Sequence, residues 1–118
     1  MVKLVAFVKR KEGLSLDEFY AHWFDVHGPL ITNTPELARH IVRYEQLRPT
    51  DHADWMRGSG FDGVTIHWIE SPAEFEAFVN EPKYAEVLMP DEDSFLDRDS
   101  LVWMITDEPQ VTIDGPMT

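Results

Sequence analysis

Two helix-start signals, each placed after an apolar, strand-like segment, constrain the fold of this chain most strongly. Ser15 and Glu18 form the S-x-x-E capping box, in which each side chain can satisfy a free backbone N–H at the start of a helix. Ser71, Pro72 and Glu74 repeat the signal with an N-cap, a proline at the first helical position and a capping partner. We therefore expect one helix to begin after each of these positions.

Four segments have the composition of strands. Val2–Lys9 is apolar in both alternating sets of residues, which is typical of a strand covered on both faces. His40–Leu47, Phe61–Glu70 and Leu101–Thr106 are the other three. The resulting order β-α-β-β-α-β predicts an α+β, ferredoxin-like fold, with a four-stranded antiparallel sheet and two main helices on one face.

The first helix carries apolar residues at spacings of three and four, so that they line one face. These residues are Leu16, Phe19, Tyr20, Trp23 and His27. Gly28 and Pro29 follow directly and predict the end of this helix. His22 and His27 are five positions apart, so they are not expected to share a helix face as residues four apart do.

The remaining segments are expected to be irregular. Thr32–Glu36 predicts a loop, and Arg48–Gly60 predicts a long connection of the kind that often carries function. Asn80–Asp99 is acidic and contains two prolines, which favours a short helix and a loop. The tail at about 107–118 is expected to extend a sheet edge or to wrap a neighbouring molecule.

Bulk properties exclude several classes of protein. A chain of 118 residues fits a single domain, 1–118, and its formal net charge of -12 disfavours nucleic acid as a partner. No apolar run is long enough to span a membrane, and the N-terminus lacks the features of a signal peptide, so a cytoplasmic location is expected. The chain has no cysteine, which leaves histidines, carboxylates, tyrosines and water for any chemistry.

Helices on one face leave the other face of the sheet bare. Because most of the predicted strands are apolar on both faces, we expect the bare face to pack on the same face of a second copy, giving a homodimer. A cavity between sheet and helices, or between the two sheets, is then the natural binding site for a small hydrophobic molecule.

Two motifs resemble the EthD family, a branch of the dimeric α+β barrel superfamily. The first is KRKEGLSLDEFYAHWFDVHGPLI near the start of the chain, and the second is the central FDGVTIHWIES. The segment RPTDHADW resembles the corresponding part of methylmuconolactone methylisomerase. The resemblance covers nearly the whole chain and implies activity on small hydrophobic lactones, aromatics or polyketides without metal or organic cofactor.

Carried over by resemblance, three residues are implied to be catalytic. His27 matches the histidine of the HGPL element, His52 resembles the histidine ahead of the isomerase's third strand, and Asp62 matches the acidic residue of the FDG element. One departure is notable. Members commonly have a glutamate two positions before the strand Trp68, where this chain has Ile66, which implies a more apolar pocket and puts a reaction dependent on that glutamate in doubt.

The other candidate residues allow two interpretations. Trp23, Tyr44, Trp55 and Trp68 can wall an aromatic pocket or simply form core. His67 has opposite strand parity to Asp62, which favours a packing role for it. A metal site is not expected, because the histidines lack metal-ligand spacing.

The leading hypothesis is a lyase or isomerase, of the dehydratase or lactone isomerase type, that uses His27 and His52 as proton carriers. Asp62 would orient a histidine or bind a polar group. A non-catalytic dimeric binding or accessory protein for a hydrophobic metabolite or an oxygenase system is the alternative, and it is favoured by Ile66. A cofactor-free monooxygenase is a third possibility.

Overall fold

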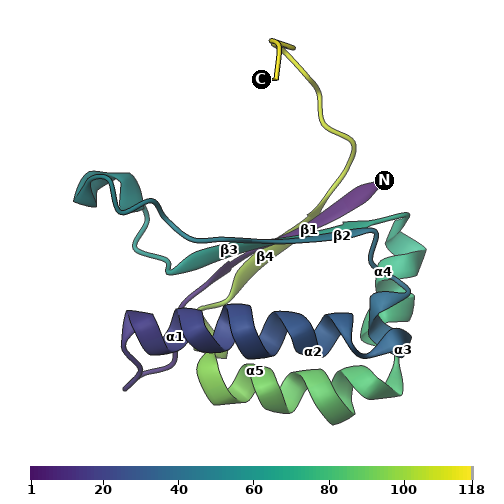
Figure 1. The fold of residues 1–118 in the computed structure, drawn as a ribbon. Coiled ribbons are helices and arrows are strands. Elements are labelled where there is room, and N and C mark those ends of the chain that lie inside the picture. Colours follow the sequence, from purple (N-terminus) through teal and green to yellow (C-terminus); the bar gives the residue numbers. More distant parts are fainter. Residues whose placement is uncertain (118) are drawn as a thin grey trace.

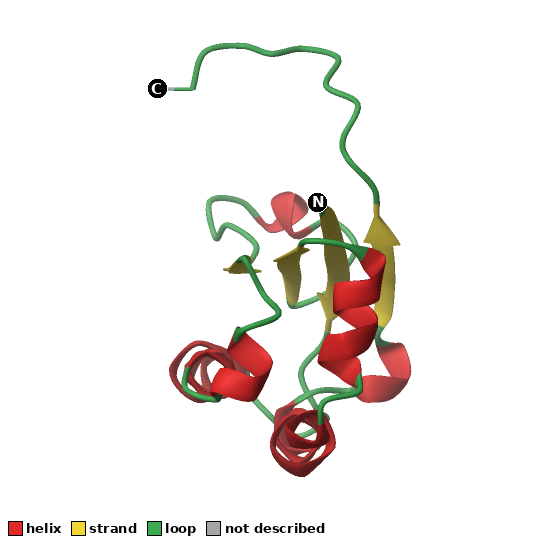
Figure 2. Cartoon of the chain, turned by 90° about the vertical axis from the view of Figure 1, so that its right-hand side faces the viewer, coloured by secondary structure: helices red, strands yellow, loops and turns green. Residues whose placement is uncertain are grey.

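The computed structural model describes residues 1–117 and consists of one antiparallel sheet with its main helices on one face (Figure 1). The strands lie in the order β2-β3-β1-β4, and every neighbouring pair is antiparallel. Turned by a quarter, the molecule shows the α-helices on one side of the sheet, and the short red turn near the N-terminus is the 3-10 turn Asp54–Arg57 (Figure 2). The predicted α+β, ferredoxin-like fold is confirmed.

The elements follow the predicted order with more helix than expected. The strands are β1 (Val2–Val8), β2 (Arg43–Leu47), β3 (Gly63–Ile69) and β4 (Val102–Thr106). The α-helices are α1 (Leu16–His22), α2 (Gly28–Thr32), α3 (Pro35–Ala38), α4 (Pro72–Val79) and α5 (Met89–Phe95). Two π-helical turns, Trp23–His27 and Tyr84–Leu88, precede α2 and α5, and two 3-10 turns cover Asp54–Arg57 and Arg98–Ser100.

Both helix-start signals are present in the structure. Ser15 and Glu18 form the complete capping box, with each side chain accepting from the other residue's backbone N–H. At the second site the Ser71 hydroxyl accepts from the backbone N–H of Glu74, but the Glu74 side chain bonds to His40 instead of returning to the cap. Local capping therefore sets the starts of α1 and α4.

The prediction that Gly28 and Pro29 end the first helix is wrong. The chain continues without interruption from α1 through the π-helical turn Trp23–His27 into α2. The N–H of Gly28 bonds to the carbonyl of Trp23, five residues back, so the turn just before Pro29 is wide. A wide turn accommodates a residue that has no N–H and whose ring would clash in a regular helix.

A second π-helical turn lies in the acidic segment 80–99, for which the sequence predicts a short helix and a loop. Here the N–H of Met89 bonds to the carbonyl of Tyr84, again five residues back and directly before a proline, Pro90. The π-helical turn and α5 form one continuous helix that lies alongside α1 and α2 under the sheet (Figure 1). The helix is longer than the sequence indicates, because proline usually ends a helix and the wide turn lets this one continue past Pro90.

The core forms two clusters between sheet and helices. One is centred on Phe19, Trp23 and Phe95, which are almost fully buried, and the other on Leu37 and Phe78. Among residues 1–117 there is no helix of sufficient length and apolar character to cross a membrane. Beyond β4 the tail runs away from the sheet (Figure 1), with Ile113 exposed, and its last residue, 118, lies outside the described residues.

Candidate functional site

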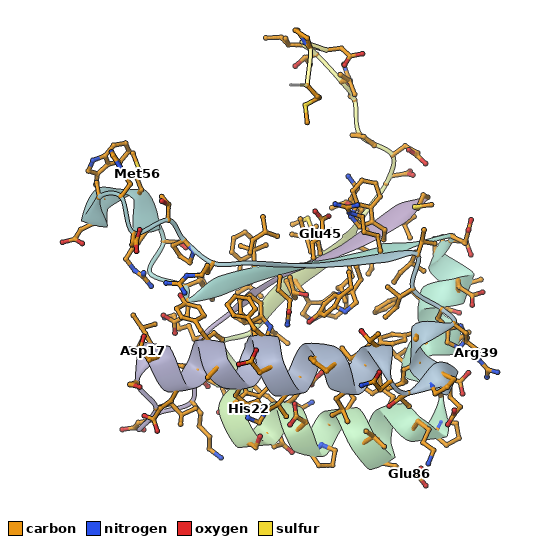
Figure 3. The ribbon with its side chains drawn as sticks, viewed as in Figure 1. Asp17, His22, Arg39, Glu45, Met56 and Glu86 are labelled. Carbon is orange, nitrogen blue, oxygen red and sulfur yellow. The ribbon has the colours of Figure 1, made fainter. Side chains whose placement is uncertain are left out.

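A cavity of about 380 Å³ lies between the covered face of the sheet and the helices, lined by members of both core clusters. Its walls are largely apolar, with Leu4, Ile31, Phe75 and Phe78 among them. Figure 3 shows side chains filling the space between the sheet and the helices. The volume suits a small organic molecule.

His27 lines this cavity and is bonded to a carboxylate. It is buried, and its Nδ1 lies 2.8 Å from an oxygen of Asp91 at the start of α5. The other Asp91 oxygen lies 2.8 Å from Nε2 of His22, so one carboxylate bridges the two histidines. The expectation that His22 and His27 do not share a face is wrong, because the π-helical turn between them brings residues five apart into register.

The environment of His27 favours its neutral form. Burial lowers its pKa, and the hydrogen bond to Asp91 opposes that effect without cancelling it. If Nδ1 donates to Asp91, Nε2 is the unprotonated nitrogen of the neutral ring. His27 is therefore arranged to accept a proton, and Asp91 is placed to stabilise the resulting cation.

Glu92, the next residue on α5, also lines the cavity. Burial raises its pKa to about 7, and Arg98, whose Nε lies 4.0 Å from the carboxylate, only partly offsets this. Near neutral pH, both protonation states of a carboxyl group with that pKa are populated, so the group can donate or accept a proton. Sequence reasoning missed Glu92, because nothing distinguishes it locally from the other acidic residues of its segment.

The sheet contributes three polar side chains to the cavity: Tyr44 from β2, and Thr65 and His67 from β3. Tyr44 packs against His67 with ring centroids 4.3 Å apart, and burial raises the pKa of Tyr44 to about 12. Burial lowers the pKa of His67 to about 3, so this histidine is neutral at physiological pH. His67, for which the sequence favoured packing alone, packs as expected but also faces the cavity.

Some of the residues predicted for the site line the cavity, and others lie elsewhere in the fold. His27, Trp23 and Tyr44 line the cavity. Asp62 does not. It is buried just before β3, where its carboxylate accepts from the backbone N–H of Arg10 at 2.8 Å and pairs with the Arg10 guanidinium at 3.1 Å. These contacts anchor the chain after β1.

The long connection between β2 and β3 carries two of the predicted residues away from the cavity. His52 is exposed, and its one hydrogen bond within the described chain joins its backbone N–H to the Thr50 hydroxyl. Trp55, at the 3-10 turn Asp54–Arg57, is 77% exposed. Figure 3 shows this turn, at the labelled Met56, projecting beyond the sheet.

Ile66 and Trp68 lie on the open face of β3, opposite the cavity. The indole N–H of Trp68 donates to Glu45 at 2.6 Å, and the Lys3 ammonium lies 4.0 Å from the centre of its ring. Within one chain, the residue at position 66 therefore shapes the open face. The expectation of a more apolar pocket there bears on a cavity between two sheets, not on the one between sheet and helices. In residues 1–117 no group of three or more histidine, aspartate or glutamate side chains is arranged to hold a metal ion.

Comparison with known proteins shows which family and which solved structures this chain is similar to. The family model described as EthD domain matches residues 11–99. Among curated protein sequences none matches significantly. A solved structure described as an ethyl tert-butyl ether D (EthD) family protein from Bacillus halodurans is 21% identical, with a TM-score of 0.69 over 92% of this chain and 99% of that one.

Two further solved structures share the fold at lower identity. A dimeric protein of unknown function with a ferredoxin-like fold from Bacteroides fragilis is 10% identical, with a TM-score of 0.66 over 91% of this chain and 95% of that one. Hydroxynitrile lyase from Passiflora edulis is 18% identical, with a TM-score of 0.63 over 95% of this chain and 96% of that one.

Proposed function

Since this chain belongs to the EthD family, whose domain model covers residues 11–99, we propose that it is a cofactor-free lyase or isomerase acting on a small hydrophobic carbonyl, lactone or aromatic compound. The observation that carries the proposal is the bond between His27 and Asp91 at the edge of an apolar cavity. An imidazole held by a carboxylate through one nitrogen is a recurrent arrangement of general bases.

His27 performs the first proton transfer in this scheme. Its Nε2 takes a proton from a hydroxyl group, or from a carbon next to a carbonyl, and the electron pair left behind forms the new double bond or enolate. The imidazolium that results is stabilised by Asp91, 2.8 Å away.

Glu92 performs the second transfer. In its protonated form it delivers a proton to the leaving group or to another carbon of the substrate. The proton held by His27 then passes through solvent to the Glu92 carboxylate, which restores both groups for the next turnover. The pKa of about 7 supports this role, since the carboxyl group carries a proton over a large part of the neutral range. Glu92 thus takes the role that the sequence suggested for His52, which lies in the exposed connection.

Turnover of two probes tests the proposal: cleavage of mandelonitrile, which releases benzaldehyde, and isomerisation of α-angelica lactone. The first probe is chosen because one neighbour in fold is described as a hydroxynitrile lyase. His27→Gln and Glu92→Gln are each expected to lower kcat by about 10²–10⁴-fold, since general acid–base groups typically contribute that much. Asp91→Asn is expected to act through His27 and to shift the pH profile as well as the rate.

The matched control is His52→Gln, which makes the same substitution in the exposed connection and is expected to keep full activity. Absence of turnover by the wild type, or wild-type rates in His27→Gln, would contradict the proposal. Binding of the same compounds without turnover would favour the alternative, a binding or accessory protein, which the largely apolar cavity wall also supports.

We also propose that the chain forms a homodimer through the open face of the sheet. Phe7 of β1 and Val102 and Met104 of β4 are exposed there, at 37%, 53% and 61%, beside Ile66. Contiguous apolar surface of this kind is typical of an interface. The Bacteroides fragilis neighbour, which shares the fold, is described as dimeric.

Light scattering on Met104→Glu tests the dimer. A charge in the middle of the open face is expected to convert dimers to monomers at micromolar concentration, whereas Val26→Glu, on the exposed side of the helical layer, is expected to leave them intact. A monomeric wild-type protein would refute the proposal.

A further inference from the structure

Two polar atoms in the cavity wall make no hydrogen bond of ordinary geometry within the described chain, although the Tyr44 hydroxyl lies near one of them, that of Thr65. These are the hydroxyl oxygen of Thr65 and Nδ1 of His67, in residues that are 8% and 7% exposed. Both residues line the cavity from β3, two positions apart, so their side chains lie on the same face of the strand. Neither contributes to the bond between His27 and Asp91.

Unpaired buried polar atoms are rare, because each has lost its bonds to water without a replacement. Two of them on one face of β3, in the wall of a cavity of about 380 Å³, can act as hydrogen-bond donor and acceptor for a ligand. We infer that Thr65 and His67 together bind a neutral oxygen group, a hydroxyl or a carbonyl, of the compound that occupies the cavity. The inference rests on the proposed function only in that both concern this cavity.

The pair matches such groups in its hydrogen-bonding capacity. The Thr65 hydroxyl can donate or accept, and a neutral imidazole can do either at a given nitrogen by changing tautomer. Two donors hold a carbonyl oxygen, and one donor with one acceptor holds a hydroxyl. Tyr44, packed against His67, fixes the ring of that histidine in place.

The charges around the cavity oppose an anionic ligand. Arg98 is already paired with Glu92 and, at 3.0 Å, with Asp93. Burial lowers the pKa of His27, which is bonded to Asp91, and lowers that of His67 to about 3, so the described cavity wall offers no unpaired cation to a carboxylate or phosphate. The ligand is therefore a neutral oxygenated molecule with an apolar body, which packs on side chains such as Ile31 and Phe78.

Three probes of similar size separate these features: benzyl alcohol, ethylbenzene, in which a methyl replaces the hydroxyl, and benzoate, which is anionic. Binding is followed by the intrinsic tryptophan fluorescence, because Trp23 and Trp103 line the cavity, and by the NMR signals of the histidine rings. The wild type is expected to bind benzyl alcohol and ethylbenzene but not benzoate at millimolar concentration.

The quantity compared is the affinity ratio, which is the affinity for benzyl alcohol divided by that for ethylbenzene. The isosteric substitution Thr65→Val is expected to lower this ratio by about tenfold, because it removes one neutral hydrogen bond. His67→Phe, which keeps an aromatic ring beside Tyr44, is expected to do the same. Thr106→Val is the matched control, because the Thr106 hydroxyl bonds to the Lys3 carbonyl outside the cavity, and its affinity ratio is expected to equal that of the wild type.

An unchanged ratio in Thr65→Val and His67→Phe, failure of benzyl alcohol to bind, or tighter binding of benzoate would each overturn the inference. These outcomes are independent of turnover. His27→Gln is expected to retain the wild-type affinity ratio even where activity is lost. A ratio that depends on Thr65, found in a protein with no turnover, would keep the inference and reject the proposed function.

Discussion

The two faces of β3 show how one strand serves two purposes. Thr65 and His67 point into the cavity, whereas Ile66 and Trp68 point to the open face of the sheet. The buried face thus holds polar atoms without partners, while the open face presents apolar surface and the polar atom of Trp68 is bonded to Glu45. This is the reverse of what burial alone would favour.

The reversal indicates that neither face is complete in a single ligand-free chain. A ligand would supply the hydrogen bonds that the polar atoms on the covered face lack. A second surface would bury the exposed apolar side chains on the open face. The two faces therefore predict different responses to mutation, pH and protein concentration.

The largest expected effect comes from one isoleucine on each face of the same strand. Ile69 is 0% exposed, and Ile69→Ala is expected to lower the free energy of unfolding by about 2–5 kcal/mol at any protein concentration. Ile66→Ala is expected to cost about 1 kcal/mol or less in the monomer and more as protein concentration rises, because only a partner buries that face. Urea unfolding at two protein concentrations measures both. Equal, concentration-independent losses would remove the distinction between the faces.

Glu92 on the covered side is expected to make the protein less stable as pH rises. Its pKa is about 7 in the folded chain against 4.5 in a model compound, so the folded state holds the proton more tightly. The penalty is absent below pH 4.5, grows between 4.5 and 7, and reaches at most about 3 kcal/mol above 7. Glu92→Gln should remove it, giving a gain in stability at neutral pH and none at pH 4.5.

Unfolding curves at several pH values test this prediction, with Glu86→Gln as the control on an exposed part of the same helix. A gain that is the same at every pH would show that proton binding is not its cause.

Gly63 tests how closely the covered face is packed. A methyl group added there would lie 2.5 Å from Cη2 of Trp23, far inside van der Waals contact. Gly63→Ala is therefore expected to cost about 1–3 kcal/mol through overpacking, and Trp23→Phe in the same chain should recover part of that loss. Additive losses in the double variant, measured by thermal unfolding, would show that the two side chains do not compete for space.

The smallest expected effect lies on the open face, at Glu45, and its pH dependence is opposite to that of Glu92. The hydrogen bond from the Trp68 indole, followed by one from Arg43, lowers the pKa of Glu45. Its contribution to stability is therefore present above pH 4.5 and lost as pH falls through the folded-state pKa. Glu45→Gln should be slightly less stable than the wild type at neutral pH and should match it in acid. If Glu45→Gln lost more stability in acid than at neutral pH, the lowered pKa of Glu45 in the folded chain would be contradicted.

Features with local causes were predictable. The capping pattern at Ser15 and the N-cap at Ser71 located two helix starts, and alternation located the strands. The resemblance to EthD proteins, carried by motifs around His27 and Asp62, is confirmed by the family match. Of the eight residues predicted for the site, Trp23, His27 and Tyr44 line the cavity.

Features that depend on distant segments were not predictable in the same way. Asp91 joins His27 across 64 positions of sequence, and Glu92 acquires its environment only because α5 packs beside α1 and α2. The prolines at 29 and 90 pointed to helix ends, and the π-helical turns that accommodate them became visible only in the folded chain.

The sequence by itself thus determined the order of elements, the helix starts and the presence of His27 on an apolar stripe, because capping and periodicity act between residues a few positions apart. The tertiary structure decided which side chains meet in the cavity. It joined His27 to Asp91, brought Glu92, Thr65 and His67 to the same space, and left Asp62 and Ile66 outside. The physical reason is that strand parity and helix packing, rather than sequence proximity, set which atoms come within hydrogen-bonding distance.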